Sequence, residues 1–333
     1  MTAPAIARRR VLLDQALDEI FDDVHVDAQR GTVVVGDETL QSSTSVDVDP
    51  ALSAYIYGKF HSRSEASAPE PGRVRSDPDM ENRIVRATPR TMTYERLPLL
   101  ETISDPSGVF ARYFGLQAFF PSERCLEVGT SSVLAKVQTV LPYMSMGYFH
   151  YTGQAGAGNP KNLLRIYYAS DSPSAAVDAW ASLLDFADGE RVAFRAKILS
   201  RSFEYPRSDA IVVYLPSESW AWIGEICDVL SAWSTTDLRS VFTLPLADGV
   251  AASWEPPLQT SSPQRRSFGE HRSQSIARGF ADAVHVGFDV RDAVRSSMIG
   301  SGVDPLRMHR NIDSPTSLTG LRSGSRERGG SGG

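Results

Sequence analysis

The fold is decided by residues 191–215, RVAFRAKILSRSFEYPRSDAIVVYL. Apolar and polar residues alternate over 191–199, and a second apolar run covers 210–215. A period of two is typical of β-strands, so we expect two strands here. On the first strand, one face carries Arg191, Ala193, Arg195 and Lys197, and the other carries Val192, Phe194, Ala196 and Ile198. If the two strands pair, Arg207 lies near the loop end of the face that carries three cations.

This cationic face suggests an anion site. Like charges on one strand face repel, and a bound anion would neutralise them. A phosphate suits such a face because arginine grips it with two N–H groups and lysine adds a point charge. The alternative is a solvated sheet face. The arginines disfavour the charged form of Lys197, which makes this lysine a candidate general base, provided that they hold most of the phosphate charge away from it.

Lysine is rare in this chain, which has four lysines and thirty arginines. Arginine stays protonated in proteins, whereas a buried lysine can become neutral and act as a base. Genomic base composition is the competing explanation for the rarity. Lys59 and Lys197 stand in compact polar clusters, unlike Lys136 and Lys161.

Three further segments contain candidate phosphate-site residues. Lys59-Phe60-His61 stands at the end of a helix that Asp49-Pro50 is expected to open. His61 can titrate near neutral pH and hand a proton to a leaving oxygen, or it can simply complement the helix dipole. Arg272 follows Ser267 in the first turn of a later helix, where a bound phosphate would explain a cation, although a surface arginine is equally expected. Arg165 is a weaker candidate of the same type.

Composition excludes several classes of protein. The net charge of −6 argues against bulk nucleic-acid binding. Cys125 and Cys227 lack metal spacing and are expected to be reduced thiols of a cytoplasmic protein. Acidic residues interrupt the N-terminal apolar run too early for a signal peptide, and no run approaches the roughly 20 apolar residues that span a bilayer. Scattered histidines predict no metal site, and we expect no cofactor.

The order of the predicted elements indicates an α+β fold, with an antiparallel or mixed sheet and flanking helices. We expect an N-terminal helical region over 1–92 that includes a mobile loop at 62–92, a main domain over 93–312, and a disordered tail at 313–333. The expected helices cover 8–23, the segment after 50, 106–116, 172–187, 216–233 and 267–285. The other expected strands cover 24–26, 32–35, 125–128, 133–140, 147–151 and 163–168, and the Gly-rich stretch 153–158 is interpreted as a hairpin loop.

Several of these segments resemble the HopA-type effector family over roughly residues 90–310. The segments are Arg165–Tyr168, Phe194–Leu199, Tyr205–Leu215 and Ser267–Arg272. The actinobacterial members of this family are encoded in ribosomal-peptide clusters beside a kinase-like protein, where they resemble the lyase subunits of class V lanthipeptide synthetases.

A second similarity is to bacterial phosphothreonine lyases, which carry a Lys-x-His pair and a later lysine followed by an arginine. It implies a phosphothreonine-lyase-like core in which Lys197 is the base, His61 is the acid, and Lys59 and Arg207 bind phosphate. Arg195 stands where those lyases have a lysine.

The resemblance implies a phosphoserine and phosphothreonine lyase of lanthipeptide biosynthesis. Its substrate is a precursor peptide phosphorylated by a partner Ser/Thr kinase, and its dehydroalanine or dehydrobutyrine product is available to a cyclase. Two alternatives stay open: a non-catalytic phosphopeptide-binding or kinase-regulating module, and an effector-like interaction protein without a phosphate site.

Overall fold

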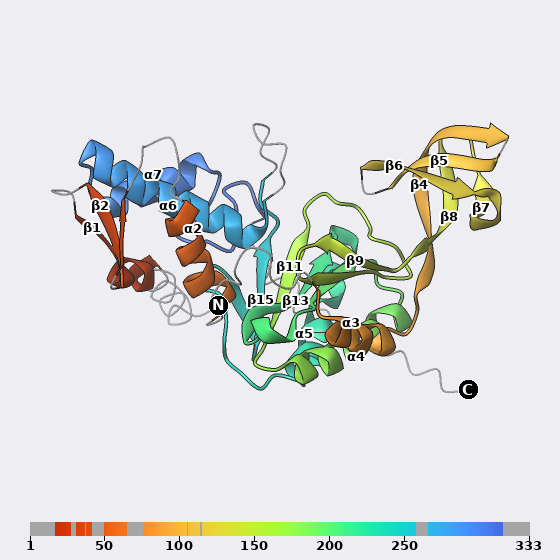
Figure 1. The fold of residues 1–333 in the computed structure, drawn as a ribbon, viewed down its shortest axis with the longest axis horizontal. Coiled ribbons are helices and arrows are strands. Elements are labelled where there is room, and N and C mark those ends of the chain that lie inside the picture. Colours follow the sequence, from red (N-terminus) through yellow and green to blue (C-terminus); the bar gives the residue numbers. More distant parts are fainter. Residues whose placement is uncertain are drawn as a thin grey trace, which may run out of the picture.

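The computed structural model describes residues 17–27, 31–36, 38–41, 50–64, 76–104, 106–113, 115–257 and 266–315. Within these ranges the chain forms sheets of three, five and seven strands, together with helices (Figure 1). The predicted α+β class is confirmed, and neighbouring strands run antiparallel.

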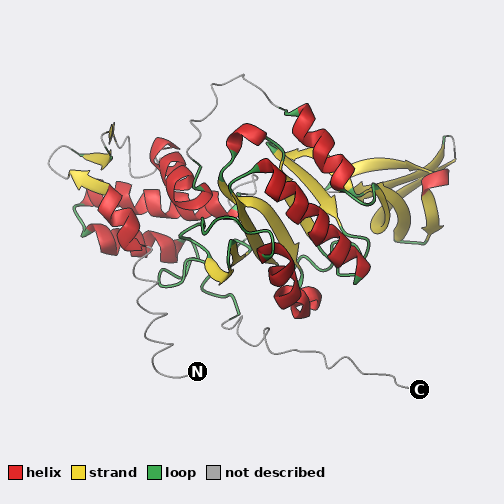
Figure 2. Cartoon of the chain, turned by 90° about the horizontal axis from the view of Figure 1, so that it is seen from below, coloured by secondary structure: helices red, strands yellow, loops and turns green. Residues whose placement is uncertain are grey.

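The seven-stranded sheet forms the centre of the fold, with the order β14-β15-β11-β13-β12-β10-β9. Its strands are β9 (Val140–Ser145), β10 (Tyr148–Thr152), β11 (Leu164–Ser170), β12 (Arg195–Leu199), β13 (Arg207–Leu215), β14 (Leu244–Ala247) and β15 (Val250–Trp254). One face is covered by α3 (Pro78–Ala87), α4 (Pro173–Gly189) and α5 (Ile223–Ser231), which lie across the sheet in Figure 2. The side chains between these layers, with Trp180 among the largest, form the main hydrophobic core.

Elements from both ends of the described chain pack together against the other face of this sheet. They are a helical segment at 17–23, β1 (Val24–Asp27), β2 (Thr32–Val35), β3 (Glu38–Gln41), α2 (Pro50–Ile56), a π-helical turn η1 (Tyr57–Ser62), α6 (Phe268–Val286) and α7 (Val290–Gly300). Figure 1 shows the N-terminal elements in red and orange against the blue helices. Tyr167 of β11 and Val212 of β13 join the hydrophobic core of this unit, so its helices cover only the part of the sheet around those strands.

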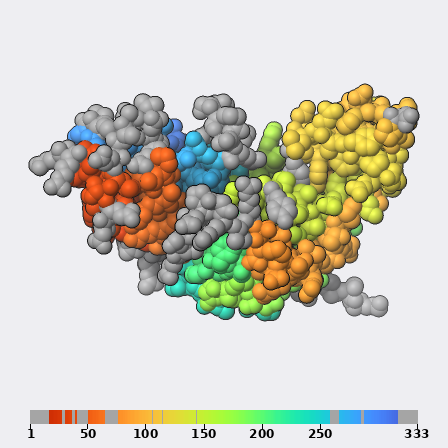
Figure 3. All heavy atoms as spheres, viewed as in Figure 1, coloured from red at the N-terminus to blue at the C-terminus, as the bar shows by residue number. Residues whose placement is uncertain are grey.

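The five-stranded sheet is built from residues 92–138 and has the order β6-β5-β4-β8-β7. Its strands are β4 (Met92–Ser104), β5 (Ser107–Tyr113), β6 (Leu116–Pro121), β7 (Cys125–Val128) and β8 (Ser132–Gln138). It has a hydrophobic core of its own and projects from the rest of the molecule as the yellow part of Figure 3.

The expected helix at 106–116 is wrong, because β5 and β6 occupy this segment. Val109 and Tyr113 suit a helical period, but Val109 and Ala111 also alternate as a strand does, and they face the core of the five-stranded sheet. Gly115, with a φ of 81°, forms the turn between the two strands. A short apolar run often fits both periods, and here the pairing of β4 with β5 decides between them.

Other boundaries also differ from the expectation. The stretch 62–92 is not one mobile loop, because it contains α3, whose first turn is capped by Asp77; residues 65–75 lie outside the described residues. The strand expected at 191–199 begins only at Arg195, and Arg191 has a left-handed backbone with a φ of 55°. The helix expected at 216–233 consists of a 3-10 turn, η4 (Ser217–Trp222), followed by α5.

Most remaining expectations are confirmed. The β1–β2 hairpin, the helix opened by Pro50, α4 after Ser172 and α6 after Ser267 are all present. The sequence did not predict β3, β4, β6, β9, β14, β15, α7 or the short turns η2 (Ser122–Arg124) and η3 (Ser202–Glu204). The expected tail lies outside the described residues from 316 onward, as does the expected helix over 8–16.

The Gly-rich stretch 153–158 is a loop between β10 and β11, as predicted. Gly153 is required there by packing, because a Cβ at this position would lie 2.5 Å from the ring of Phe194. Gly158 has a φ of 67°, which side-chain-bearing residues rarely adopt. These glycines therefore shape the loop that packs against β12.

The substitution Gly153→Ala should lower the free energy of unfolding by roughly 1–3 kcal/mol, because the Phe194 ring must move. Urea denaturation monitored by tryptophan fluorescence measures this change. The control is Gly224→Ala in α5, where the added Cβ meets nothing within 4 Å. It should be neutral or stabilising by up to about 1 kcal/mol. Equal midpoints for the two variants would contradict the packing argument.

Candidate functional site

The candidate site lies on the second face of the central sheet, beside the region covered by the helices. In the antiparallel pairing of β12 with its neighbours, Lys197 is opposite His150 on β10 and Val212 on β13. Arg195 is opposite Thr152 and Tyr214. Residues directly opposite each other share a face of the sheet. Because Ala196 and Ile198 point into the core beneath, Arg195 and Lys197 point to this second face, as predicted.

The side-chain amine of Lys197 lies over the ring of Tyr148, 3.7 Å from its centroid. Among the described residues, the amine has no hydrogen-bond or ion-pair partner. Buried charges in proteins are usually paired, so a half-buried amine with no carboxylate partner among the described residues is available to a ligand. This amine is the feature of the face that most directly suggests anion binding or proton transfer.

Tyr148 connects Lys197 to a buried ion pair. Its hydroxyl donates to Oδ2 of Asp209 at 2.9 Å and lies 3.3 Å from Nη2 of Arg207. Nε of Arg207 donates to Oδ1 of Asp209 at 2.7 Å, and Nη2 donates to Oδ2 at 3.1 Å. Burial by itself raises the pKa of Asp209, but the Arg207 guanidinium outweighs it and holds this pKa well below its usual range. The carboxylate is therefore ionised at neutral pH.

Arg207 makes further contacts within the protein. Nη1 donates to Oε2 of Glu204 at 3.1 Å, and Nη2 lies 3.3 Å from the hydroxyl of Tyr57. Glu204 also accepts from Arg201 at 2.7 Å, so two arginines share this carboxylate. Arg207 lies next to the cationic face, as predicted, but its N–H groups are largely occupied. This placement leaves Arg207 few N–H groups for a phosphate.

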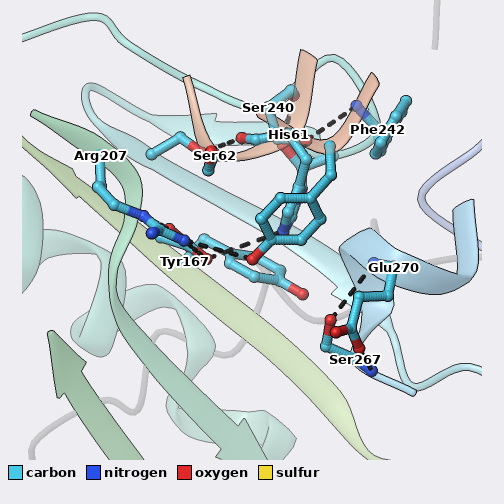
Figure 4. A network of polar contacts seen from close by, with 12 residues as sticks. His61, Ser62, Tyr167, Arg207, Ser240, Phe242, Ser267 and Glu270 are labelled. Atoms are coloured by element: carbon cyan, nitrogen blue, oxygen red, sulfur yellow. Dashed lines mark hydrogen bonds and ion pairs between the residues drawn. The ribbon is translucent and has the colours of Figure 1, made fainter. Parts of the chain in front are cut away.

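His61 is buried in an aromatic cage close to the same ion pair (Figure 4). Its ring stacks on Phe242, and the rings of Tyr57, Tyr167 and Phe268 meet it edge-on or tilted. Nδ1 lies 2.8 Å from the hydroxyl of Ser240, and Nε2 lies 3.9 Å from Oδ2 of Asp209.

Burial lowers the pKa of His61 to about 4, against the opposing effect of Asp209. The sequence-based expectation of a residue that titrates near neutral pH is therefore wrong. The imidazole is neutral at pH 7 and only 3% exposed, which does not suit a proton donor to a peptide. The hydrogen bond to Ser240 and the surrounding aromatic rings make His61 a structural part of the wall beside the site.

Lys59 does not complete the site in this structure. Its amine is ion-paired with Asp23 and lies 3.2 Å from the hydroxyl of Tyr55, on the side of the N-terminal elements. The bond to Asp23 raises the pKa of Lys59. The Lys-x-His pattern thus places its two polar side chains in different environments, because η1 turns His61 inward and leaves Lys59 half-exposed.

The motif Ser267–Arg272 has a structural explanation instead of the expected phosphate. Ser267 caps α6, and the Glu270 carboxylate accepts from the Ser267 backbone N–H at 2.7 Å, so a capping box occupies this helix end (Figure 4). Gly269 lies against His61, where a Cβ would be 2.0 Å from the imidazole. The first turn of α6 is therefore shaped to close the cage around His61.

Arg272 is fully buried, which corrects its assignment as a phosphate ligand. It donates to the backbone oxygen of Met308 and to Oδ1 of Asn311, each at 2.8 Å, and stacks on Phe268. Burial lowers its pKa to about 9. Arg272 holds the segment after α7 against α6.

Arg165 is also used internally. Its Nε donates to Glu255 at 2.5 Å, and its guanidinium lies over the ring of Tyr214. Burial opposes the charge, but Glu255 outweighs it and the pKa of Arg165 rises well above its usual value. Arg195 differs because its side chain is 40% exposed, with Glu95 of β4 at 3.6 Å. Of the predicted phosphate ligands, Arg195 is the one that the structure leaves facing outward beside Lys197.

Tyr148, His150 and Asp209 belong to the site but were not predicted from the sequence. Tyr148 and His150 belong to a strand that was predicted correctly, and their spacing of two places them on one face. Only the register of β10 against β12 shows that this face contains Lys197, and register is a long-range property. Within the described residues no three His, Cys, Asp or Glu side chains form a potential metal-binding group. No helix in the same ranges is long and apolar enough to span a bilayer.

Together, the fold and the site define an α+β protein with a cationic patch on one face of its central sheet. The model of the HopA1 effector protein family matches residues 140–310, and the chain belongs to this family. The match extends from β9 through α7, so it includes Tyr148, His150, Lys197 and Arg207 but neither Lys59 nor His61.

Two solved structures are similar to the chain at 11% sequence identity. The effector protein from Pseudomonas syringae pv. tomato strain DC3000 has a TM-score of 0.43, with coverage of 82% of this chain and 91% of that one. The effector protein from Pseudomonas syringae pv. syringae strain 61 has a TM-score of 0.40, with coverage of 82% and 99%. No curated protein matches the sequence.

The buried histidines predict a loss of stability in mild acid. His61, His150 and His271 each have a pKa lowered to about 4, first of all by burial. Because the unfolded chain takes up these protons near pH 6.5, stability is complete above that pH and falls as the pH drops toward 4. The expected contribution of each histidine is about 2 kcal/mol between pH 7 and pH 5.

Urea denaturation at a series of pH values measures this dependence. His61→Gln should flatten the curve by removing one of the three buried titrating rings. The control is His25→Gln on the exposed face of β1, which removes a histidine without touching the cage and should keep the wild-type slope. A His61→Gln curve parallel to that of the wild type would show that His61 is not held neutral.

Proposed function

We propose that this chain is a cytoplasmic lyase that eliminates phosphate from phosphoserine or phosphothreonine in a precursor peptide. A partner kinase would supply the phosphorylated peptide, and a cyclase would use the dehydroalanine or dehydrobutyrine in lanthipeptide formation. The observation that carries the proposal is the amine of Lys197, which has no carboxylate partner among the described residues and lies on the same sheet face as Arg195, whose side chain is 40% exposed. Membership of the HopA1 effector protein family is consistent with it.

The proposed reaction starts when the phosphate binds to the cationic face. Arg195 supplies N–H groups, and the phosphate competes with Glu95, whose contact with Arg195 is long at 3.6 Å. Arg207 keeps Tyr148 in place below the lysine through Asp209. The Arg195 guanidinium neutralises the negative charge of the phosphate, and the amine of Lys197 is left to act on the α-carbon.

Lys197, as the neutral amine, then removes the proton from the α-carbon. The C–H electron pair forms the Cα–Cβ double bond, and the Cβ–O bond breaks with its electrons on the phosphate oxygen. That oxygen takes a proton as it leaves. The products are the dehydroamino acid, hydrogen phosphate and the ammonium form of Lys197, which returns its proton to water. No water is consumed.

A second function is favoured by one specific contact. The ring of Tyr148 faces the amine of Lys197 at 3.7 Å, and such a contact stabilises a cation. A lysine held in its charged form would bind a phosphopeptide without reacting. The alternative is therefore a non-catalytic phosphopeptide-binding or kinase-regulating module, in which any cation at position 197 suffices.

The reaction product distinguishes a lyase from a phosphatase. A phosphothreonine peptide incubated with the protein should lose the elements of phosphoric acid, as measured by mass spectrometry, and should do so in excess EDTA as well. The unphosphorylated peptide is the control and should stay unchanged. A product with the mass of the unmodified threonine peptide would show hydrolysis, and loss of activity with EDTA would contradict a metal-independent reaction.

Lys197→Arg distinguishes the base from a simple phosphate contact. Arginine keeps the charge but cannot supply a neutral amine at accessible pH. We expect phosphopeptide affinity within about tenfold of the wild type by titration calorimetry, because a charge-assisted contact contributes roughly 1.5–3 kcal/mol and arginine replaces most of it. Elimination in a single turnover should fall to background. Substantial elimination by Lys197→Arg would exclude Lys197 as the base.

The matched control is Lys136→Arg, on an exposed position of β8 in the five-stranded sheet. It makes the same chemical change far from the cationic face, and both binding and elimination should equal those of the wild type. Equal losses in the two variants would point to a general effect of the lysine-to-arginine change rather than to a base at position 197.

A further inference from the structure

The elimination proposed above needs a proton for the leaving oxygen, and the caged His61 is poorly placed to give it. A second histidine meets the requirement. His150 on β10 lies directly opposite Lys197 on β12, so both side chains stand on the same face of the sheet. Unlike His61, it is neither predicted by the Lys-x-His pattern nor enclosed by aromatic rings in the described structure.

The side chains of His150 and Lys197 lean toward the same end of their strands. Nε2 of His150 lies 2.7 Å from the hydroxyl of Ser145, and Ser145 is opposite Tyr148 in the pairing of β9 with β10. The amine of Lys197 lies over the ring of Tyr148. The imidazole, held by Ser145 of β9, and the amine of Lys197 from β12 therefore both lie near Tyr148 on one face of the sheet.

The charges around His150 are cationic. Lys197 and Arg195 face it from β12, the uncharged Ser145 and Tyr148 face it from β9 and β10, and Glu95 of β4 is paired with Arg195. Burial, then Lys197 and Arg195, lower the pKa of His150 to about 4, so the ring is neutral in the free protein. A phosphate group bound to these cations would cancel their effect and favour a proton on the ring.

We infer that His150 is the residue that protonates the leaving phosphate oxygen, and that it gains this proton only when the substrate phosphate binds. This inference rests on the proposed function. The ring takes a proton from water as the phosphate arrives. Lys197 removes the α-proton, the Cβ–O bond breaks, and the imidazolium gives its Nδ1 proton to the departing oxygen, because Nε2 is held by Ser145. His150 ends neutral, ready for the next substrate, and Ser145 orients the ring throughout.

This arrangement has a functional consequence. Because the charge of the substrate phosphate favours the proton on His150, the protonated ring is absent until a phosphorylated residue occupies the site. Unphosphorylated serine and threonine in the same peptide cannot cause His150 to be protonated. The selectivity for phosphorylated residues would therefore come from the protonation of His150 as well as from the contacts of Arg195.

Kinetics of two matched variants test the inference. His150→Gln and His61→Gln make the same change at the two histidines. His150→Gln should lower kcat for a phosphothreonine peptide by about 10²–10⁴-fold with little change in KM. Its defect should shrink on the thiophosphothreonine peptide, whose leaving group is less basic. His61→Gln should show a smaller loss of kcat and no such rescue, because it alters only the wall of the site.

Nuclear magnetic resonance of the wild-type protein gives an independent readout that needs no variant. The probe is a peptide with a phosphonate in which CH₂ replaces the bridging oxygen, so that it binds but cannot eliminate. At pH 7 the Cε1–H resonance of His150 should move to the imidazolium position when this peptide binds. The His61 resonance should stay at the neutral position.

The outcomes are distinguishable. Wild-type turnover combined with full activity of His150→Gln would overturn the inference and leave the lyase proposal intact. Absence of elimination by the wild type would overturn the lyase proposal. In that case the Cε1–H resonance still shows whether binding of the phosphonate peptide protonates His150. A shift to the imidazolium position supports this protonation, and an unchanged His150 signal in the saturated complex refutes it.

Discussion

The buried ion pair between Arg207 and Asp209 is the interaction on which the site depends. Asp209 fixes Tyr148 of β10 through a hydrogen bond, and it faces His61 of η1 at 3.9 Å. Arg207 also contacts Tyr57 of η1 and Glu204 of η3, the turn before β13. One pair of charges thus connects the central sheet to the N-terminal segment that packs on it. Removing one partner of a buried ion pair leaves the other charge buried without a partner, which lowers the free energy of unfolding by about 3–5 kcal/mol.

The charged residues around this ion pair are paired with one another. Arg201, Glu204, Arg207 and Asp209 alternate in sign, so the buried part of the site is close to neutral. Arg165 is matched by Glu255, and Arg272 is held by backbone and amide oxygens. Within the described ranges, the half-buried amine of Lys197 therefore differs from the buried arginines of this region, because they have partners and it has no carboxylate partner.

The sequence predicted the central features because they depend on local pattern. The alternation around Lys197 predicted the strand and its cationic face, and Ser267 predicted the start of α6. What the sequence could not predict depends on long-range pairing. The register that brings His150 opposite Lys197 and the cage that buries His61 join residues far apart in the chain.

The predicted phosphate ligands show the same limit. Lys59, Arg165 and Arg272 were predicted because each is a cation in a suggestive motif, and their partners Asp23, Glu255 and Met308 lie far from them in the sequence. Arg207 differs, because its partners Glu204 and Asp209 are close to it in the sequence, but their pairing with it was not predicted. A cation's partner is decided by tertiary structure. Arg195 keeps an outward position beside Lys197 because β12 places both side chains on the same face of the sheet.

The fate of the α-hydrogen tests the central claim most directly. A phosphothreonine peptide deuterated at the α-carbon can be followed in single turnovers by mass spectrometry, next to its protonated counterpart. Elimination at Lys197 predicts a product without the deuterium and a slower reaction of the deuterated peptide. Threonine that retains its deuterium and forms at an equal rate from both peptides, or a bound peptide that never changes, would contradict the account.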